Sequence, residues 1–133
     1  MKMNKLSFGF LGFIAILLAS CSAASITQGN YTGTFTSNGY PTYSGSATAN
    51  ITLVNDNVVN VRISSNGNPD VYVDNVGLEK TEILGVVHVS FVGSNSDLIL
   101  NGDYSQVSGI NDFDVQIDSV ANTSAYISFS GKK

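Results

Sequence analysis

Asp112-Phe113-Asp114-Val115-Gln116-Ile117-Asp118 places an apolar residue at every second position, with a polar residue on each side of it. The same alternation runs through Ala47–Leu53, Val59–Ser64 and Ala125–Phe129. A period of two is typical of antiparallel strands that bury one face and expose the other. After residue 21 no window shows a convincing helical period with caps. The pattern therefore predicts an all-β fold.

Eight strand candidates follow from this pattern, separated by segments rich in Asn, Gly, Ser and Pro. They cover roughly 30–37, 44–54, 58–65, 70–79, 82–92, 97–105, 110–118 and 123–130. In the fourth candidate the apolar phase slips between Val73 and Val76, which predicts a bulge at Asp74-Asn75. Glycines that would let the sheet curl are Gly33, Gly45, Gly85 and Gly102.

Short and uniform connections suit two architectures, an up-and-down barrel and a two-sheet sandwich. We expect the antiparallel eight-stranded up-and-down barrel, because a sandwich usually needs one or two longer crossovers. Aromatic residues in the inward phase would either pack the core or line a ligand cavity, and the sequence leaves both open. They are Tyr31, Phe35, Phe91, Tyr104, Phe113 and Phe129.

The N-terminal segment has Lys2 and Lys5 followed by an apolar run from Leu6 to Ala19. This run is shorter than the roughly 20 residues that a membrane-spanning helix needs, and its flanks are typical of a secretory signal. The run closes on Leu18-Ala19-Ser20-Cys21, which resembles the lipobox of bacterial lipoproteins. That resemblance implies cleavage before Cys21 and lipidation of Cys21, which is the only cysteine of the chain.

The chain accordingly divides into a signal peptide (1–20), a lipidated tether (21–28) and one barrel domain (29–133). From residue 21 onwards there are four basic and ten acidic residues, a side-chain net charge of −6. Such a charge argues against nucleic acid as a partner, and against docking on anionic lipid through protein charge. Membrane attachment is therefore expected through acyl chains on Cys21.

Gly29-Asn30-Tyr31-Thr32-Gly33-Thr34 resembles the Gly-x-Tyr-x-Gly opening of calycin-like small lipoproteins of Bacteroidota, related in position to the Gly-x-Trp opening of lipocalins. The resemblance implies a lipid-anchored, calycin-like eight-stranded barrel in the cell envelope, at the outer membrane. A barrel of eight strands is either filled by its own side chains or holds one small ligand.

Catalytic chemistry has a single candidate, His88, in an apolar strand segment. A hydrolase would need a nucleophile and an orienting acid beside it, and the Gly-x-Ser-x-Gly elbow is absent from the sequence. A zinc site would need two or three more nitrogen or sulfur ligands. We therefore interpret His88 as an ordinary strand residue and expect no catalytic residue and no cofactor.

Acidic side chains gather on the outward phase of the sixth and seventh strands. Asn101 and Asp103 should face Asp112, Asp114 and Asp118, and like charges opposed across strands cost stability. A hard cation such as Ca²⁺ would relieve that cost, which makes Asn101, Asp103, Asp112 and Asp114 candidate ligands. The sequence favours the alternative, a solvated acidic face, because it holds no calcium-loop motif.

Asp118-Ser119-Val120 falls at the predicted turn between the last two strands. It resembles the Asp-Ser/Thr-aliphatic motif for O-glycosylation in Bacteroidota, which implies a glycan on Ser119.

For function, the sequence favours a non-catalytic, lipid-anchored envelope protein whose barrel binds a small apolar ligand or a protein partner. The alternative is an inhibitor or accessory protein that acts through a loop end of the barrel, such as Asn66–Asp70. An enzyme is the third possibility, and its one supporting residue is His88.

Overall fold

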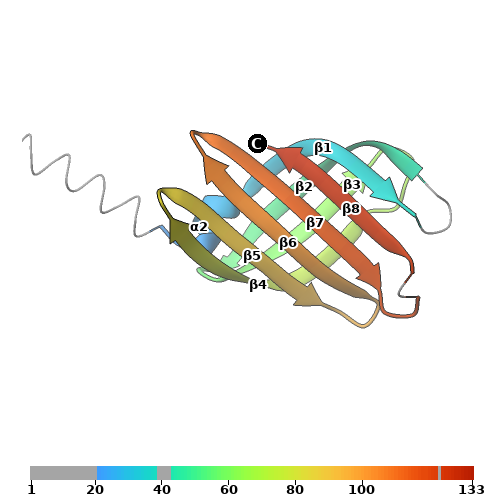
Figure 1. Ribbon diagram of the computed structural model, residues 1–133. Coiled ribbons are helices and arrows are strands. Elements are labelled where there is room, and N and C mark those ends of the chain that lie inside the picture. The colour runs from blue at the N-terminus through green and yellow to red at the C-terminus, as the bar shows by residue number, and fades with distance from the viewer. Residues whose placement is uncertain (1–20, 39–42, 123) are drawn as a thin grey trace, which may run out of the picture.

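The computed structural model describes residues 21–38, 43–122 and 124–133. The expected signal peptide, with Leu18-Ala19-Ser20, lies outside the described residues. Eight antiparallel strands close into a barrel in which each strand pairs with its sequence neighbours and β8 returns to β1 (Figure 1). The elements are the helix α2 (Ala23–Thr27), β1 (Gly29–Ser37), β2 (Tyr43–Asn55), β3 (Val58–Ser65), β4 (Val71–Ile83), β5 (Val86–Ser94), β6 (Leu98–Val107), β7 (Ile110–Ser119) and β8 (Tyr126–Lys132).

The predicted all-β, eight-stranded barrel is confirmed over the sandwich, because the strand order closes on itself without a crossover. Three predicted boundaries are wrong, since the fifth strand begins at Val86 and not at 82, the eighth begins at Tyr126 and not at 123, and the fourth ends later than predicted. The fourth strand was expected to end at residue 79, but β4 continues to Ile83, and the chain turns at Leu84-Gly85 with φ of 52° and 78°. The charged run Glu79–Glu82 mimics a loop in sequence, whereas in the fold it forms the outer end of a long strand. Gly85 is thus a turn residue and not a mid-strand kink.

The bulge predicted at Asp74-Asn75 is confirmed. Val76 pairs with Val59 and Val73 pairs with Val61, so two residues of β4 oppose one residue of β3. Asn75 takes a left-handed conformation with φ of 53°, and its backbone N–H donates to the side chain of Asn60 at 3.0 Å. The extra residue brings Val73 and Val76 onto the same face, and both are fully buried.

The seam between β1 and β8 depends on a pair of glycines. Gly33 pairs with Gly131, and a Cβ added to Gly33 would lie 1.9 Å from the carbonyl oxygen of Ser130. A Cβ on Gly131 would lie 2.8 Å from the carbonyl oxygen of Thr32. The two strands therefore approach so closely that neither position has space for a side chain, as expected where a sheet bends to close.

Aromatic side chains fill the interior of the barrel. The ring of Phe113 lies 5.2 Å from Tyr31, 5.0 Å from Phe91 and 6.1 Å from Phe129, measured between centroids. Branched aliphatic residues from β2, β3 and β4 complete this core. Within the described residues, every buried side-chain nitrogen and oxygen has a hydrogen-bond partner. Of the two roles open for the aromatic set, the structure supports core packing.

A short helix, α2, occupies the segment expected to be a tether. The side chain of Ser22 accepts a hydrogen bond from Ser25 N at 3.1 Å and caps the first turn. Ala23, Ala24 and Thr27 are buried, and Ala24 N donates to Asp56 O at 3.1 Å in the turn between β2 and β3. Five residues are too few to show helical periodicity in the sequence, and packing against the barrel stabilises them.

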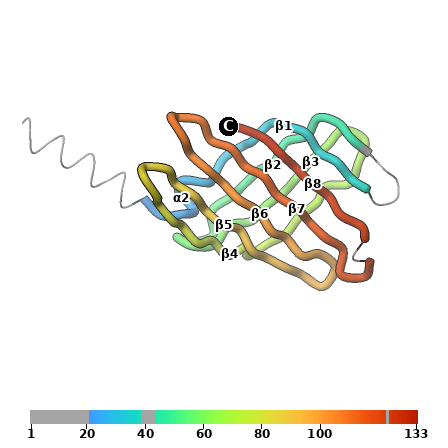
Figure 2. The backbone as a smooth tube through the Cα atoms, viewed as in Figure 1, coloured from blue at the N-terminus to red at the C-terminus, as the bar shows by residue number. Residues whose placement is uncertain are grey.

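The up-and-down topology gives the barrel two different ends (Figures 1 and 2). At one end, which we call the Cys21 end, β1 begins, β2, β4 and β6 end in hairpin turns, and α2 packs. At the opposite end, the distal end, β1, β3, β5 and β7 finish. Cys21 and the loop Asn66–Asp70 therefore lie at opposite ends of the molecule.

Candidate functional site

Cys21, the predicted lipidation site, begins the described part of the chain at the Cys21 end. It is half-buried, and its carbonyl oxygen accepts a hydrogen bond from Lys80 Nζ on β4 at 2.8 Å. Between Cys21 and the barrel stands only the capped helix α2. Any group attached at Cys21 is therefore held close to the barrel end.

A network of polar side chains joins α2 to the interior beneath it. Lys133 Nζ donates to the carbonyl oxygens of Ile26 at 2.8 Å and Gln28 at 2.7 Å, and lies 5.4 Å from the ring of Tyr31. Tyr31 Oη donates to Thr27 O at 2.6 Å. Burial, and then the neighbouring Tyr104, raises the pKa of Tyr31, while burial lowers the pKa of Lys133. The network fastens the helix to the barrel, and no sequence motif indicated it.

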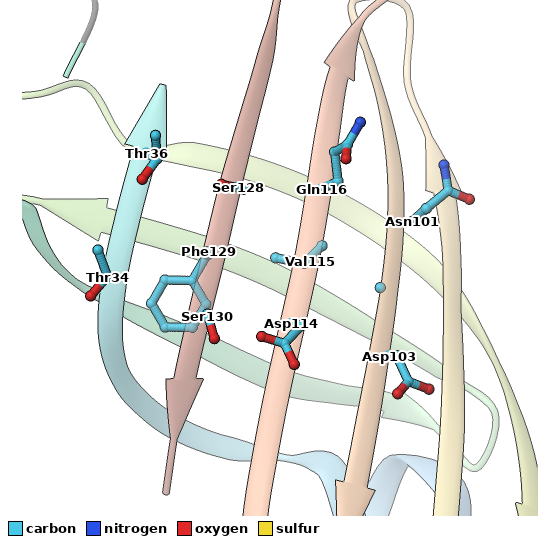
Figure 3. Close-up of a pocket in the computed structure, with 11 residues that line it drawn as sticks. Thr34, Thr36, Asn101, Asp103, Asp114, Val115, Gln116, Ser128, Phe129 and Ser130 are labelled. Carbon is cyan, nitrogen blue, oxygen red and sulfur yellow. The ribbon is translucent and has the colours of Figure 1, made fainter. Parts of the chain in front are cut away.

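The acidic residues singled out in the sequence form part of an open outer face. Asp103 pairs directly with Asp114 across β6 and β7, and Asn101 pairs with Gln116 (Figure 3). Asp112 lies apart from them, with its carboxylate 3.7 Å from Lys132 Nζ. The structure thus brings together three of the four candidate calcium ligands.

Hydroxyl side chains of β1 and β8 extend this face. Thr34 and Thr36 lie beside Ser128 and Ser130, and together with the β6 and β7 residues they line a shallow depression of about 550 Å³ (Figure 3). Among the residues that the structure describes, no group of three or more His, Cys, Asp or Glu side chains could hold a metal ion. Open surface of this kind, bordered by the Asp103 and Asp114 carboxylates, is what a solvated acidic face requires.

A second depression lies at the distal end, and most of its lining residues are apolar or aromatic. It measures about 230 Å³ and is bordered by the last residues of β1 and β7 and the first residues of β6 and β8. Its lining consists of Ser37, Leu98, Ile117, Ser119, Ala125, Tyr126 and Ile127. This depression leaves no mark in the sequence, because it forms only where the ends of β1 and β7 meet the starts of β6 and β8.

Asn38 holds the β8 side of the distal depression in place. Its Oδ1 accepts a hydrogen bond from Tyr126 N at 2.7 Å, and its Nδ2 donates to Ser124 O at 3.0 Å. Its own backbone N–H donates to Tyr126 O at 3.1 Å. One asparagine therefore fixes the start of β8 beside the end of β1.

Ser119, the predicted glycosylation site, is the last residue of β7 and lines the distal depression. Its hydroxyl accepts a hydrogen bond from Asn122 N at 3.3 Å, and its backbone N–H donates to Ala125 O at 3.1 Å. Ser119 is half-buried, whereas the adjacent Val120 is exposed. Glycosylation at Ser119 stays a prediction.

His88 lies on the outer face of β5, between Thr81 of β4 and Ser105 of β6. Its Nδ1 is 3.9 Å from Asp103 Oδ2, and both side chains are substantially exposed. An exposed pair at this distance contributes little to stability.

Comparison of the chain with protein-family models, with curated proteins and with solved structures finds no match. Among the described residues, no helix is long and apolar enough to cross a membrane.

Proposed function

We propose that the chain is a non-catalytic, lipid-anchored protein of the cell envelope, attached at the outer membrane, that binds a partner protein through its distal end. The observation that carries the proposal is the pairing of Leu18-Ala19-Ser20-Cys21 with a barrel whose distal depression lies at the end opposite Cys21. If Cys21 anchors one end of the barrel to the membrane, the distal end points away from the membrane surface, where a partner can reach it.

The anchor follows from the lipobox-like residues and from simple energetics. Each buried acyl methylene contributes about 0.8 kcal/mol to membrane binding, and stable attachment needs more than one chain. Lipidation of a lipobox cysteine would supply several chains. The barrel itself carries a net charge of −6 from residue 21 onwards and would not be drawn to anionic lipid as a whole.

A protein partner is favoured over a ligand inside the barrel by the packing of the core. Tyr31, Phe91, Phe113 and Phe129 occupy the interior, and the polar atoms buried among the described residues already have partners. The distal depression, at about 230 Å³, is smaller than the roughly 300–1,000 Å³ of most small-molecule sites. It suits one or two apolar side chains of a partner.

The surroundings of the distal depression suggest the character of that partner. Tyr126 and Val120 are exposed beside it, and aromatic residues are enriched where proteins meet. Asp70, Asp97 and Asp118 lie at the same end, so the partner's contact surface should carry basic residues around an apolar centre. This arrangement corresponds to an inhibitor or accessory protein that acts through a loop end.

The anchor is tested by intact-mass measurement of the full-length protein purified from bacterial membranes. We expect a mass that corresponds to cleavage before Cys21 plus acyl chains. The Cys21→Ser variant should lack the acyl mass and leave the membrane fraction. An unmodified Cys21 in a membrane-bound chain would contradict the proposal.

The binding end is tested by photo-crosslinking in intact cells. A photoreactive side chain at Val120 should give a discrete protein adduct, whereas one at Ser130, on the outer face of β8, should not. Adducts of equal yield at both positions, or at neither, would argue against a partner at the distal end. A small apolar molecule recovered in stoichiometric amount from the purified protein would instead favour the ligand alternative.

A further inference from the structure

The hairpin turns at the Cys21 end carry apolar side chains into solvent. β4 and β5 meet at Ile83 and Leu84, which are 64% and 99% exposed. The hairpin of β6 and β7 exposes Val107 and Ile110, and β2 exposes Leu53 and Val54 before its turn. Three successive turns at one end of the barrel thus each present a pair of apolar residues. We propose that these turns dock into the interfacial region of the lipid bilayer.

Leu84 is the strongest single indication, because the fold itself disfavours leucine there. It has φ of 52° and is followed by Gly85 with φ of 78°, the conformation of a tight hairpin turn. Such positions favour Asn, Asp or Gly, and a bulky side chain at positive φ is an outlier. The equivalent residue of the next hairpin is Ser108, with φ of 51°. A leucine that neither packs nor suits its backbone indicates a contact outside the chain.

The position of Cys21 identifies that contact as lipid. This step rests on the proposed lipidation of Cys21. Ala24 N bonds to Asp56 O in the β2–β3 turn, and Lys80 Nζ bonds to Cys21 O near the end of β4. Because α2 is fastened to these two elements, acyl chains on Cys21 would enter the bilayer directly beside the apolar turns.

The placement of the lysines agrees with an orientation in which the Cys21 end faces the bilayer. The net charge of the chain does not reveal this placement. All three lysines of residues 21–133, Lys80, Lys132 and Lys133, lie towards the Cys21 end, where they accompany the acidic residues Asp56, Glu79, Glu82 and Asp112. The distal end has Asp70, Asp97 and Asp118 and no lysine, and the remaining basic residue, Arg62, lies on the distal half of β3. These amines are bonded within the protein, and they place its lysine charge on the side where phosphate headgroups would lie.

A tryptophan scan tests the docking, because the chain contains no tryptophan of its own. Leu84→Trp and Ile110→Trp place the probe at the Cys21 end, and Val120→Trp places it at the distal end as the matched control. Each full-length, acylated protein is reconstituted into phosphatidylethanolamine–phosphatidylglycerol vesicles with brominated acyl chains, after its acylation has been verified by intact mass.

We expect bromine to reduce the emission of the first two variants about twofold or more, as for side chains that reach some 5–10 Å into the headgroup–acyl boundary. Val120→Trp should be unaffected. Acylated protein whose three probes are all unquenched would overturn the docking while the anchor stands. Protein without acyl chains would overturn the proposed function and the docking together. A blue shift that depends on protein concentration and not on bromine would mean that a second copy covers the turns, and would also overturn the proposal.

Discussion

The Cys21 end and the distal end of the barrel are closed in different ways. At the Cys21 end the helix α2, with Ala23, Ala24 and Thr27 buried, and the Lys133 amine cover the interior, and the apolar residues of the turns point outwards. At the distal end no helix covers the described strands, and an apolar depression remains between the strand ends. The difference agrees with the proposal that the Cys21 end attaches to the membrane and the distal end binds a partner, with the packed core joining the two ends.

The largest effect on the unfolding free energy is expected at the β1–β8 seam, on which both ends of the barrel depend. Gly33→Ala would place a methyl group 1.9 Å from Ser130 O, so the barrel must open or shift, at a cost of about 3 kcal/mol in unfolding free energy. Gly77→Ala, where the nearest atom is Val92 O at 3.5 Å, should cost less than about 1 kcal/mol. Urea unfolding followed by circular dichroism gives both values. Equal losses in the two variants would refute a special role for the seam.

Asn38→Ala should weaken the distal end selectively. It removes the acceptor for Tyr126 N and the donor to Ser124 O, and the expected loss is about 1–2 kcal/mol. Amide hydrogen exchange should accelerate at Tyr126 and Ala125 while the amides of α2 keep their protection. Asn66→Ala, in the loop after β3, is the control for an asparagine at the same end. Faster exchange at both ends would show that the ends are not independent.

Tyr31→Phe tests the Cys21 end through the pH dependence of the unfolding free energy. Burial, and then Tyr104, raises the pKa of Tyr31 above its ordinary value of 10.0, so the unfolded chain releases this proton first as the pH rises. The unfolding free energy should therefore fall above about pH 10, with Tyr31 contributing up to about 1.4 kcal/mol per pH unit.

The variant should lose about 1 kcal/mol at neutral pH, because the hydrogen bond to Thr27 O disappears, and should show a shallower alkaline decline. Urea unfolding at about pH 8 and about pH 11 measures both effects. Tyr126→Phe, at the distal end, is the matched control. If the unfolding free energy of Tyr31→Phe declined with pH as steeply as that of the parent, groups other than Tyr31 would be responsible for the alkaline decline.

Leu84→Asn should have the smallest effect on stability, and of opposite sign. Asparagine tolerates the left-handed conformation better than leucine, so the unfolding free energy should rise by about 0.5–1 kcal/mol in detergent solution. The same change should weaken the interaction of the turn with vesicles. Ser108→Asn is the control that should alter the stability alone. A destabilised Leu84→Asn would show that the leucine packs on the barrel.

Much of the fold could be predicted from residue pattern because a strand pattern is local. Phe113, Val115 and Ile117 point inwards, as their spacing requires, and the phase slip between Val73 and Val76 located a real bulge. The turn at Leu84-Gly85 was missed because Leu84 continues the apolar pattern and Glu79–Glu82 resembles a loop. The helix α2 was missed because its five residues are held by tertiary contacts.

The candidate sites divide in the same way, into residues that a local pattern marks and contacts that only the tertiary structure forms. Cys21 and the acidic residues could be named from sequence because a motif or a spacing marks them. The sequence could not show that Asp112 would face Lys132 while Asp103 faces Asp114, since that depends on how β7 aligns with both β6 and β8.

By itself the sequence determined that this chain is all-β with eight strands, and where a signal-like segment meets Cys21, because periodicity, turn residues and short motifs act between near neighbours. The tertiary structure alone decided that the interior is filled, that α2 seals one end, and that the apolar turns share the end of Cys21 while the depression occupies the other. Those features depend on strand register and on the closure of β8 onto β1, which bring together residues about a hundred positions apart, such as Gly33 and Gly131.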